Sequence, residues 1–273
     1  MTRLLVLASL LLATTTFAQD LSGFEKLLLP VEPFVLVTGA AGTEFTTRLD
    51  TASPGRFRYF FGGLGDIQTF DPTRLLPAPV ISPSQPRSEI GRLLYVEKSA
   101  VNDVSMQLTL TSRPAGEPAH TARVDSLPVV RERDFRTGPI AFANVPYSYV
   151  YLTEDIIRPA YAQYRHQLRI YDVDLRGDAA VRIRIFDRNA GGSLVKEAII
   201  PLDRRNGGDP SYPFYANLDL DAFFNGCRPF SLHTPCVGTD TRIELLPVTE
   251  GLHYWAFVTL TNNFTQEVTA LLP

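Results

Sequence analysis

Short segments in which apolar and polar residues alternate dominate this chain. The clearest is 104–111, where every second residue is apolar and the residues between are small or polar. A period of two is typical of a β-strand with one face on a core and the other in water. The same alternation occurs at 167–174 and 181–187, and the Gly and Asp of 174–178 are typical of turns. We therefore predict that these two segments form a hairpin.

The C-terminal end predicts a second hairpin. Residues 252–261 alternate, Asn262 and Asn263 suit a tight reversal because asparagine tolerates positive φ, and 264–272 return. Further strands are predicted at 44–49, 56–61, 92–97, 122–130, 194–202, 212–220 and 242–247. Helical periodicity is confined to 153–165, where Pro159 limits its length. Such short strands indicate an all-β protein built as antiparallel sandwiches.

Two stretches interrupt this pattern. Residues 62–88 carry five prolines, which cannot donate to a strand ladder, and we interpret them as a long surface connection or a sheet edge. The charged stretch 131–136, followed by Thr-Gly-Pro, separates two strand-rich halves. We place the domain junction there, which predicts one β-sandwich at 22–135 and a second at 136–273.

The first 18 residues predict a cleaved signal peptide. Arg3 precedes an apolar run, and small residues around Ala18 form a cleavage site before Gln19. We therefore expect the mature protein to be secreted or periplasmic. No later apolar run reaches the length of a membrane helix, so we expect no membrane anchor.

Charge and cysteine content restrict the partners. The net charge is −3, and no run of basic residues forms a stripe that could neutralise a phosphate backbone, so nucleic acid is not expected as a partner. Cys227 and Cys236 are the two cysteines of the chain. In an oxidising compartment they predict a disulfide that closes a small loop.

Several short segments resemble segments of secreted bacterial proteins of unknown function with tandem immunoglobulin-like β-sandwich domains. They are Leu27-Leu28-Leu29-Pro30-Val31, Arg92-Leu93-Leu94-Tyr95-Val96-Glu97, Leu127-Pro128-Val129-Val130-Arg131-Glu132, Leu168-Arg169-Ile170-Tyr171-Asp172 and Trp255-Ala256-Phe257-Val258. The resemblance implies that both sandwiches, 22–135 and 136–273, are immunoglobulin-like. It carries over no catalytic or binding residue. The chain lacks the cysteine pair flanking a tryptophan that marks antibody-type domains.

Local motifs of catalysis are absent from the sequence. It contains no Gly-x-Ser-x-Gly elbow, Gly-rich phosphate loop, His-Glu-x-x-His or paired Cys-x-x-Cys. The spacing of Cys227, His233 and Cys236 matches no established metal-ligand pattern. We therefore expect no catalytic residue, no metal site and no cofactor.

Some smaller patterns allow two interpretations. Asp172 with Asp174, and Asp219 with Asp221, have the alternate spacing of calcium loops, but neither pair has the further acidic residues of a full site, which favours turn and strand-end roles. The tripeptide 176–178, Arg-Gly-Asp, is found in integrin ligands, but a hairpin turn explains its Gly and Asp.

Three arginines of the predicted hairpin point to one outer face. They are Arg169, Arg182 and Arg184, and like charges so placed require a counter-charge. Glu244, which points outward on the 242–247 strand, is the candidate. We interpret this face as a solvated network of ion pairs rather than an anion site.

The strongest candidates for binding lie in the second half of the chain. Tyr147, Tyr149 and Tyr151 would share one face of an extended segment, and tyrosine offers a wide contact area with a polar tip. Such a face can stack on sugars or grip a protein, although the same rings can also cover a sandwich edge. The disulfide loop would display three further candidates, Arg228, Phe230 and His233.

The sequence therefore predicts a secreted, non-enzymatic recognition or scaffolding protein with a protein or carbohydrate ligand. Two alternatives stay open. A secreted carbohydrate-active enzyme on a sandwich scaffold would need paired carboxylates meeting in a groove. A purely structural surface spacer would need neither a groove nor an aromatic face.

Overall fold

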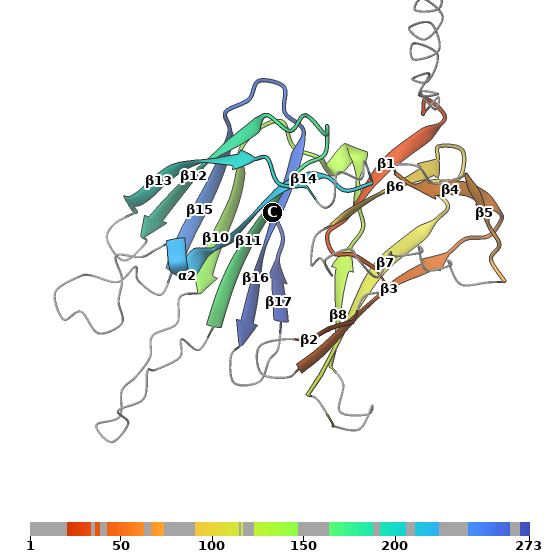
Figure 1. Ribbon diagram of the computed structural model, residues 1–273, viewed down its shortest axis with the longest axis horizontal. Helices are drawn as coiled ribbons and strands as arrows, with labels where there is room; N and C mark the ends of the chain where they lie inside the picture. The colour runs from red at the N-terminus through yellow and green to blue at the C-terminus, as the bar shows by residue number, and fades with distance from the viewer. Residues whose placement is uncertain are drawn as a thin grey trace, which may run out of the picture.

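The computed structural model describes residues 21–33, 36–38, 43–62, 67–73, 91–114, 116, 123–146, 164–187, 192–205, 211–223, 240–262 and 268–273. In this part of the chain the fold is all-β, as predicted, with two short helical segments, η2 (Glu132–Asp134) and α2 (Leu220–Phe223) (Figure 1). Neither of these segments is long and apolar enough to cross a membrane. The predicted signal peptide, 1–18, lies outside the described residues.

The first sandwich is made of sheets A and B. Sheet A has the strand order β5 (Gln68–Phe70), β4 (Phe57–Phe61), β6 (Arg92–Glu97), β1 (Phe24–Leu29), β9 (Val130–Arg131). Sheet B has the order β2 (Leu36–Thr38), β3 (Thr43–Ala52), β7 (Ser105–Pro114), β8 (Arg123–Pro128). Leu28 and Leu93 of sheet A meet Leu49, Leu108 and Leu127 of sheet B in one cluster of buried side chains.

The second sandwich is made of sheets C and D. Sheet C has the order β14 (Phe214–Asp219), β11 (Tyr164–Asp172), β16 (Tyr254–Asn262), β17 (Val268–Leu271). Sheet D has the order β10 (Ile140–Pro146), β15 (Asp240–Pro247), β12 (Ala179–Asp187), β13 (Ser193–Leu202). Ile170 and Val258 of sheet C share a buried cluster with Val181, Ile183 and Leu245 of sheet D.

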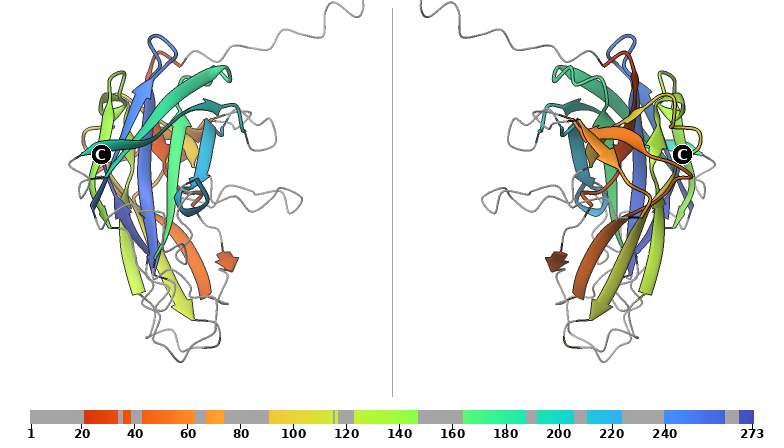
Figure 2. Two further views of the ribbon diagram at one scale, coloured as in Figure 1. Left: turned by 90° about the vertical axis from the view of Figure 1, so that its left-hand side faces the viewer. Right: turned by 90° about the vertical axis from the view of Figure 1, so that its right-hand side faces the viewer.

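The two sandwiches repeat one strand arrangement. The order β5-β4-β6-β1 in sheet A matches β13-β12-β15-β10 in sheet D, and β3-β7-β8 in sheet B matches β11-β16-β17 in sheet C. All of these pairs are antiparallel. The two sandwiches differ at the edges of their sheets. Sheet A has an additional edge strand, β9. The edge strand beside β3 in sheet B is β2, whereas the corresponding edge strand beside β11 in sheet C is β14. The edge strands β8 of sheet B and β17 of sheet C lie in contact (Figure 2).

Most of the strands predicted from alternation are confirmed. The segment 92–97 coincides with β6, and 104–111 lies almost wholly in β7, whose Leu108 is buried and whose Gln107 is exposed. Alternation did not identify β1, β2, β5 or β10. The burial pattern of β1 does not alternate, and the other three are short or irregular. The Pro-rich stretch 62–88 contains β5, which is the edge strand of sheet A and agrees with the edge interpretation.

The predicted hairpin of 167–174 and 181–187 is wrong. Both strands form, but β11 pairs with β14 and β16, whereas β12 pairs with β13 and β15. The residues between them, 173–178, cross from sheet C to sheet D. Positive φ angles at Leu175 (61°) and Gly177 (76°) reverse the chain direction there. At Gly177 a Cβ would lie 2.7 Å from the ring of Phe214, which gives a second reason for glycine.

The second predicted hairpin pairs as expected, but its reversal is displaced. β16 and β17 are antiparallel neighbours, and the register pairs Thr261 with Val268. β16 ends at Asn262 and β17 begins at Val268, so the connection is longer than the two predicted asparagines, and its residues 263–267 lie outside the described part of the chain. Of the predicted helix at 153–165, residues 164 and 165 belong to β11, and the rest lies outside the described residues.

Candidate functional site

The residues predicted to bind a ligand lie outside the described part of the chain. They are Tyr147, Tyr149, Tyr151, Arg228, Phe230 and His233, and the same holds for Cys227 and Cys236. These residues and the disulfide stay predictions. The most strongly organised group of polar and aromatic side chains in the described residues instead lies where the two sandwiches meet.

The two central strands of sheet C, β11 and β16, are largely buried on both faces, and their outer face packs on the first sandwich. Tyr171 lies in β11 and Val173 directly follows it, while Trp255 and Phe257 lie on β16; all four belong to the buried cluster of the first sandwich. Their exposed fractions are between 0% and 4%. The Phe257 ring lies 6.4 Å from the Tyr171 ring and 5.4 Å from the Trp255 ring, measured between centroids. We call these four residues the junction cluster.

Tyr171 ties the two sandwiches together with one hydrogen bond. Its hydroxyl donates to the carbonyl oxygen of Pro30 at 2.7 Å. A side chain on Gly91 would clash here, because a Cβ would lie 2.5 Å from Leu29 O and 3.1 Å from the Tyr171 ring. Burial raises the pKa of Tyr171 to about 12, so the phenol stays protonated at neutral pH.

Arg92 is the central charged group of this junction. Its guanidinium lies 2.8 Å from Glu32 Oε1, and the two side chains are 10% and 3% exposed. The rings of Phe61 and Tyr212 lie 5.0 Å and 5.1 Å from the guanidinium carbon. The backbone N–H of Leu93 donates to Ser211 O at 2.7 Å, which joins sheet A to the segment before β14. The two rings and the carboxylate offset part of the cost of burying this cation.

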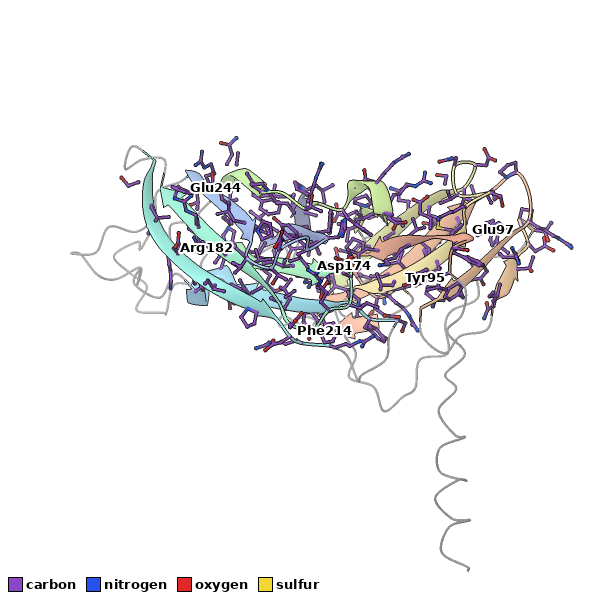
Figure 3. All side chains as sticks on the ribbon, turned by 90° about the horizontal axis from the view of Figure 1, so that it is seen from above. Tyr95, Glu97, Asp174, Arg182, Phe214 and Glu244 are labelled. Carbon is purple, nitrogen blue, oxygen red and sulfur yellow. The ribbon has the colours of Figure 1, made fainter. Side chains whose placement is uncertain are left out.

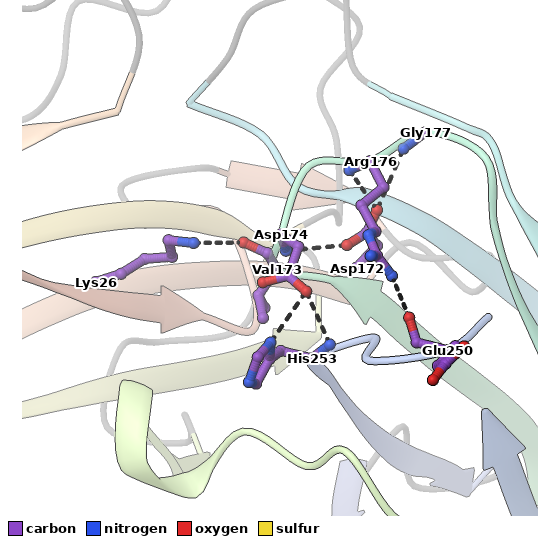
Figure 4. Close-up of polar contacts among 8 residues, drawn as sticks. All are labelled: Lys26, Asp172, Val173, Asp174, Arg176, Gly177, Glu250 and His253. Carbon is purple, nitrogen blue, oxygen red and sulfur yellow. Dashed lines mark hydrogen bonds and ion pairs between the residues drawn. The ribbon is translucent and has the colours of Figure 1, made fainter.

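A polar corner forms beside the junction cluster, where two crossing connections of the second sandwich meet β1 (Figure 4). Asp174 accepts hydrogen bonds from the backbone N–H of His253 at 2.9 Å and lies 3.1 Å from its Nδ1. Lys26 Nζ of β1 donates to Val173 O at 2.8 Å. Arg176 donates from Nη1 to Glu250 O at 2.8 Å. The corner therefore joins the connections 173–178 and 248–253 to each other and to the first sandwich.

Asp172 holds the 173–178 connection in shape. Its buried carboxylate accepts hydrogen bonds from the backbone N–H groups of Asp174 at 2.9 Å, Arg176 at 2.8 Å and Gly177 at 3.3 Å. Burial raises the pKa of Asp172, and the three backbone donors oppose that rise. This geometry supports the turn interpretation of Asp172 and Asp174 over a calcium site.

The second acidic pair, Asp219 and Asp221, lies at the end of a strand and in a short helix. Asp219 is the last residue of β14, and Asp221 belongs to α2. Within the described residues, no three His, Cys, Asp or Glu side chains come together to hold a metal ion. The Arg-Gly-Asp triplet at 176–178 likewise forms part of the crossing connection, with its arginine bound to Glu250 O.

The predicted ion-pair network is confirmed on the outer face of sheet D. Arg184 lies 3.3 Å from Glu197 and 3.6 Å from Glu244, and Arg242 lies 2.7 Å from Glu244. Arg182 lies 3.8 Å from Glu197. Figure 3 shows Arg182 and Glu244 on this side of the second sandwich, with Asp174 and Phe214 nearer the first. The positive and negative groups alternate across three strands, so the face is an ion-pair network as predicted.

Arg169 was wrongly placed on that face. It lies in sheet C, is 7% exposed, and its guanidinium carbon lies 5.5 Å from the Phe257 ring. The error has the same cause as the wrong hairpin, because β11 and β12 belong to different sheets.

The junction was not predicted, although the chain carries a signal for it. Tyr254, Ala256 and Val258 alternate along 252–261, and all three belong to the buried cluster of the second sandwich. The positions between them are Trp255 and Phe257, so this strand is apolar on both faces. A continuous apolar run indicates a strand buried on both sides.

Searches against protein-family models, curated proteins and solved structures found no match for this chain.

Proposed function

We propose that this is a secreted or periplasmic, non-enzymatic recognition or scaffolding protein that holds two β-sandwich domains, 22–135 and 136–273, in one fixed orientation. Residues 1–18 are its signal peptide. The ligand class is protein or carbohydrate. The tyrosines at 147, 149 and 151 and the loop residues Arg228, Phe230 and His233 are the proposed contacts.

One observation carries the scaffolding part of this proposal: the outer face of sheet C is buried against the first sandwich. Domains of one chain usually move relative to each other unless the interface between them is large and hydrophobic. Here Tyr171 and Phe257 are fully buried in that interface, and Lys26 and Ser211 add hydrogen bonds across it. A rigid pair of sandwiches presents the loops of both at a constant spacing.

The linker supports the same fixed arrangement. The backbone N–H of Arg136 donates to Tyr254 O, and the backbone N–H of Tyr254 donates to Arg136 O, each with an N to O distance of 2.9 Å. The Tyr254 hydroxyl lies 2.9 Å from Gly138 O. The chain between the sandwiches is therefore attached to the start of β16 instead of spanning a gap.

Three acidic groups of the described residues with displaced pKa values have structural partners. Hydrogen bonds from Arg58 lower the pKa of Glu97, hydrogen bonds from Thr73 lower that of Asp71, and burial raises that of Asp172, which caps a turn. Each of these carboxylates serves a local structural contact, whereas catalytic carboxylates face a common reacting group.

The immunoglobulin-like part of the proposal has partial support from strand pairing. In the second sandwich, β11 pairs with β14, as strand B pairs with strand E in immunoglobulin domains. Likewise β12 pairs with β15, as strand C pairs with strand F. The terminal strands are exchanged, because β10 joins the sheet of β15 and β16 joins the sheet of β11. We therefore propose an immunoglobulin-related sandwich with this exchange in both domains.

The fixed orientation is tested by small-angle X-ray scattering on the mature chain, residues 19–273. We expect one compact particle whose scattering agrees with the structure at every salt concentration. Phe257→Ala should broaden the distance distribution, whereas Ser126→Ala, which changes an exposed side chain of sheet B, should leave it unchanged. A wild-type profile that requires an ensemble of separated domains would contradict a fixed scaffold.

Recognition is tested by screening the mature chain on glycan and protein arrays. We expect a saturable interaction that is lost when Tyr147, Tyr149 and Tyr151 are changed to Ala, or when Arg228, Phe230 and His233 are. Thr46→Ala with Thr111→Ala, on the outer face of sheet B, is the matched control. Interactions that survive both sets would remove these residues as the site, and cleavage of a glycan on the array would contradict the non-enzymatic proposal.

A further inference from the structure

A pocket opens inside the first sandwich, away from the junction cluster. Its volume is about 210 Å³, and it lies between sheets A and B. It is lined mainly by apolar side chains from both sheets and their connections: Leu27, Val96, Val101, Val104, Met106 and Val129. Protein interiors contain few voids larger than a water molecule. A cavity of about 150 Å³ is already large enough to bind benzene.

A polar hollow of about 400 Å³ adjoins this pocket, because Val101 and Arg131 line both. We take this hollow as the mouth of the pocket. The other residues of the hollow are Glu25, Lys98, Asn102, Glu132 and Arg133. Basic side chains outnumber acidic ones around this mouth, which therefore favours an anionic group over a cationic one.

Arg131 is held at the boundary between the apolar and polar parts. Its Nε lies 3.1 Å from Glu25 Oε1, and its Nη2 lies 3.3 Å from Glu25 Oε2 and 3.2 Å from Asn102 Oδ1. These contacts use one edge of the guanidinium. Among the described residues, Nη1 has no hydrogen-bond partner. The guanidinium is thus oriented by two neighbours and keeps donors for an oxygen acceptor.

We propose that this pocket binds a small amphipathic carboxylic acid. The hydrocarbon part occupies the apolar cavity, and the carboxylate accepts hydrogen bonds from Nη1 of Arg131. If each carbon atom with its hydrogens takes up about the volume of one water molecule, roughly 30 Å³, the cavity holds on the order of seven carbon atoms. An unbranched acid of about eight carbons, such as octanoic acid, satisfies both the volume and the charge. The proposal is independent of the junction and of the predicted tyrosine face.

The test compares octanoate, 1-octanol and butyrate as ligands of the mature chain by isothermal titration calorimetry. Octanoate should bind saturably and at least 10-fold more tightly than 1-octanol, because the alcohol lacks the charge. Butyrate should bind roughly 100-fold more weakly than octanoate, since it buries four fewer methylene groups. Equal affinity for octanoate and 1-octanol would overturn the carboxylate assignment. Equal affinity for octanoate and butyrate, or no saturable octanoate binding at millimolar concentration, would overturn the pocket itself.

Two variants locate the binding site, and a third is their control. Arg131→Gln should weaken octanoate at least 10-fold and leave 1-octanol unchanged, whereas the control Arg182→Gln, on the outer face of sheet D, should change octanoate binding less than about twofold. Val104→Phe should fill the cavity and abolish binding of both ligands. Amide chemical shifts of the wild type provide a readout that requires no variant: octanoate should shift signals of residues 101–106 and 129–131. Shifts confined to other regions would contradict the assigned site.

Discussion

Sheets B and C hold the same place in the two sandwiches but meet different surroundings. Matching the inward pair Leu49–Leu108 with Ile170–Ala256 aligns their central strands. The outward pair Asp50–Gln107 of sheet B then corresponds to Tyr171–Trp255 of sheet C. Gln107 is exposed to solvent, while both aromatic residues are buried.

This comparison separates two tasks of one strand arrangement. The inward positions are apolar in both sheets because each sandwich needs its own core. The outward positions decide whether the sheet faces water or another domain. Aromatic side chains there remove large apolar areas from water, and at about 25 cal/mol per Å² such burial dominates the energy of an interface.

The largest expected effect comes from removing an outward aromatic residue of sheet C. Phe257→Ala should lower the free energy of unfolding by about 3–5 kcal/mol, as measured by urea denaturation, because it opens a cavity in a buried cluster. Ser126→Ala, outward in sheet B, should change it by less than about 0.5 kcal/mol. Similar losses of unfolding free energy for both variants would show that the two outward faces contribute equally to stability.

The buried ion pair at the junction should have the next largest effect. Arg92→Met leaves Glu32 buried without its cation and should cost about 3 kcal/mol, near the lower end for such pairs because Glu32 has further contacts. Adding Glu32→Leu should restore part of this loss. The control is Arg58→Met at the exposed Arg58–Glu97 pair, which should cost far less. A double variant less stable than Arg92→Met would contradict the electrostatic explanation.

Tyr171→Phe provides a smaller test, of the hydrogen bond to Pro30. We expect a loss of about 1 kcal/mol at neutral pH. The pKa of Tyr171 is raised from 10 to about 12, so its share of stability is complete below pH 10 and is lost as pH rises to 12. Tyr171→Phe should therefore reduce the alkaline loss of stability between pH 10 and 12.

The matched variant for that measurement is Tyr59→Phe. Tyr59 is buried inside the first sandwich, away from the junction, and burial raises its pKa to about 12 as well. Both variants should reduce the alkaline loss, but only Tyr171→Phe should alter the scattering profile. If Tyr59→Phe changed the arrangement of the sandwiches equally, the assignment of Tyr171 to the junction would be refuted.

The smallest expected effect concerns a surface pair of the first sandwich. Hydrogen bonds from Arg58 lower the pKa of Glu97, so this pair stabilises the fold above the unfolded pKa of Glu97 and loses that contribution as pH falls. An NMR titration should place the Glu97 midpoint below 4.5, and Arg58→Gln should return it toward 4.5. An unchanged midpoint would show that the exposed pair has no electrostatic effect.

Local pattern was sufficient for most strands and for the ion pairs of sheet D. Alternation depends only on which side chains avoid water, so β6 and β7 were found at nearly their observed bounds. Pairing was harder. The turn chemistry of 174–178 indicated a reversal, but a reversal within one sheet and a crossing between two sheets use the same Gly and Asp residues. The observed crossing follows from the pairing of β11 with β14 and β16 and of β12 with β13 and β15. Asp172 then holds the connection through three backbone N–H groups.

The sequence by itself determined that this chain is all-β, because the period of two in its apolar positions is compatible with little else. It also determined where the chain is interrupted: the described strands of sheets A and B end at Arg131, and those of sheets C and D begin at Ile140. Only the tertiary structure decided which strands are neighbours and that Tyr171, Trp255 and Phe257 face another domain. The strand neighbours and the surroundings of these aromatic residues depend on contacts between residues far apart in the chain. Local periodicity shows that a side chain points outward, but it does not indicate what that side chain contacts.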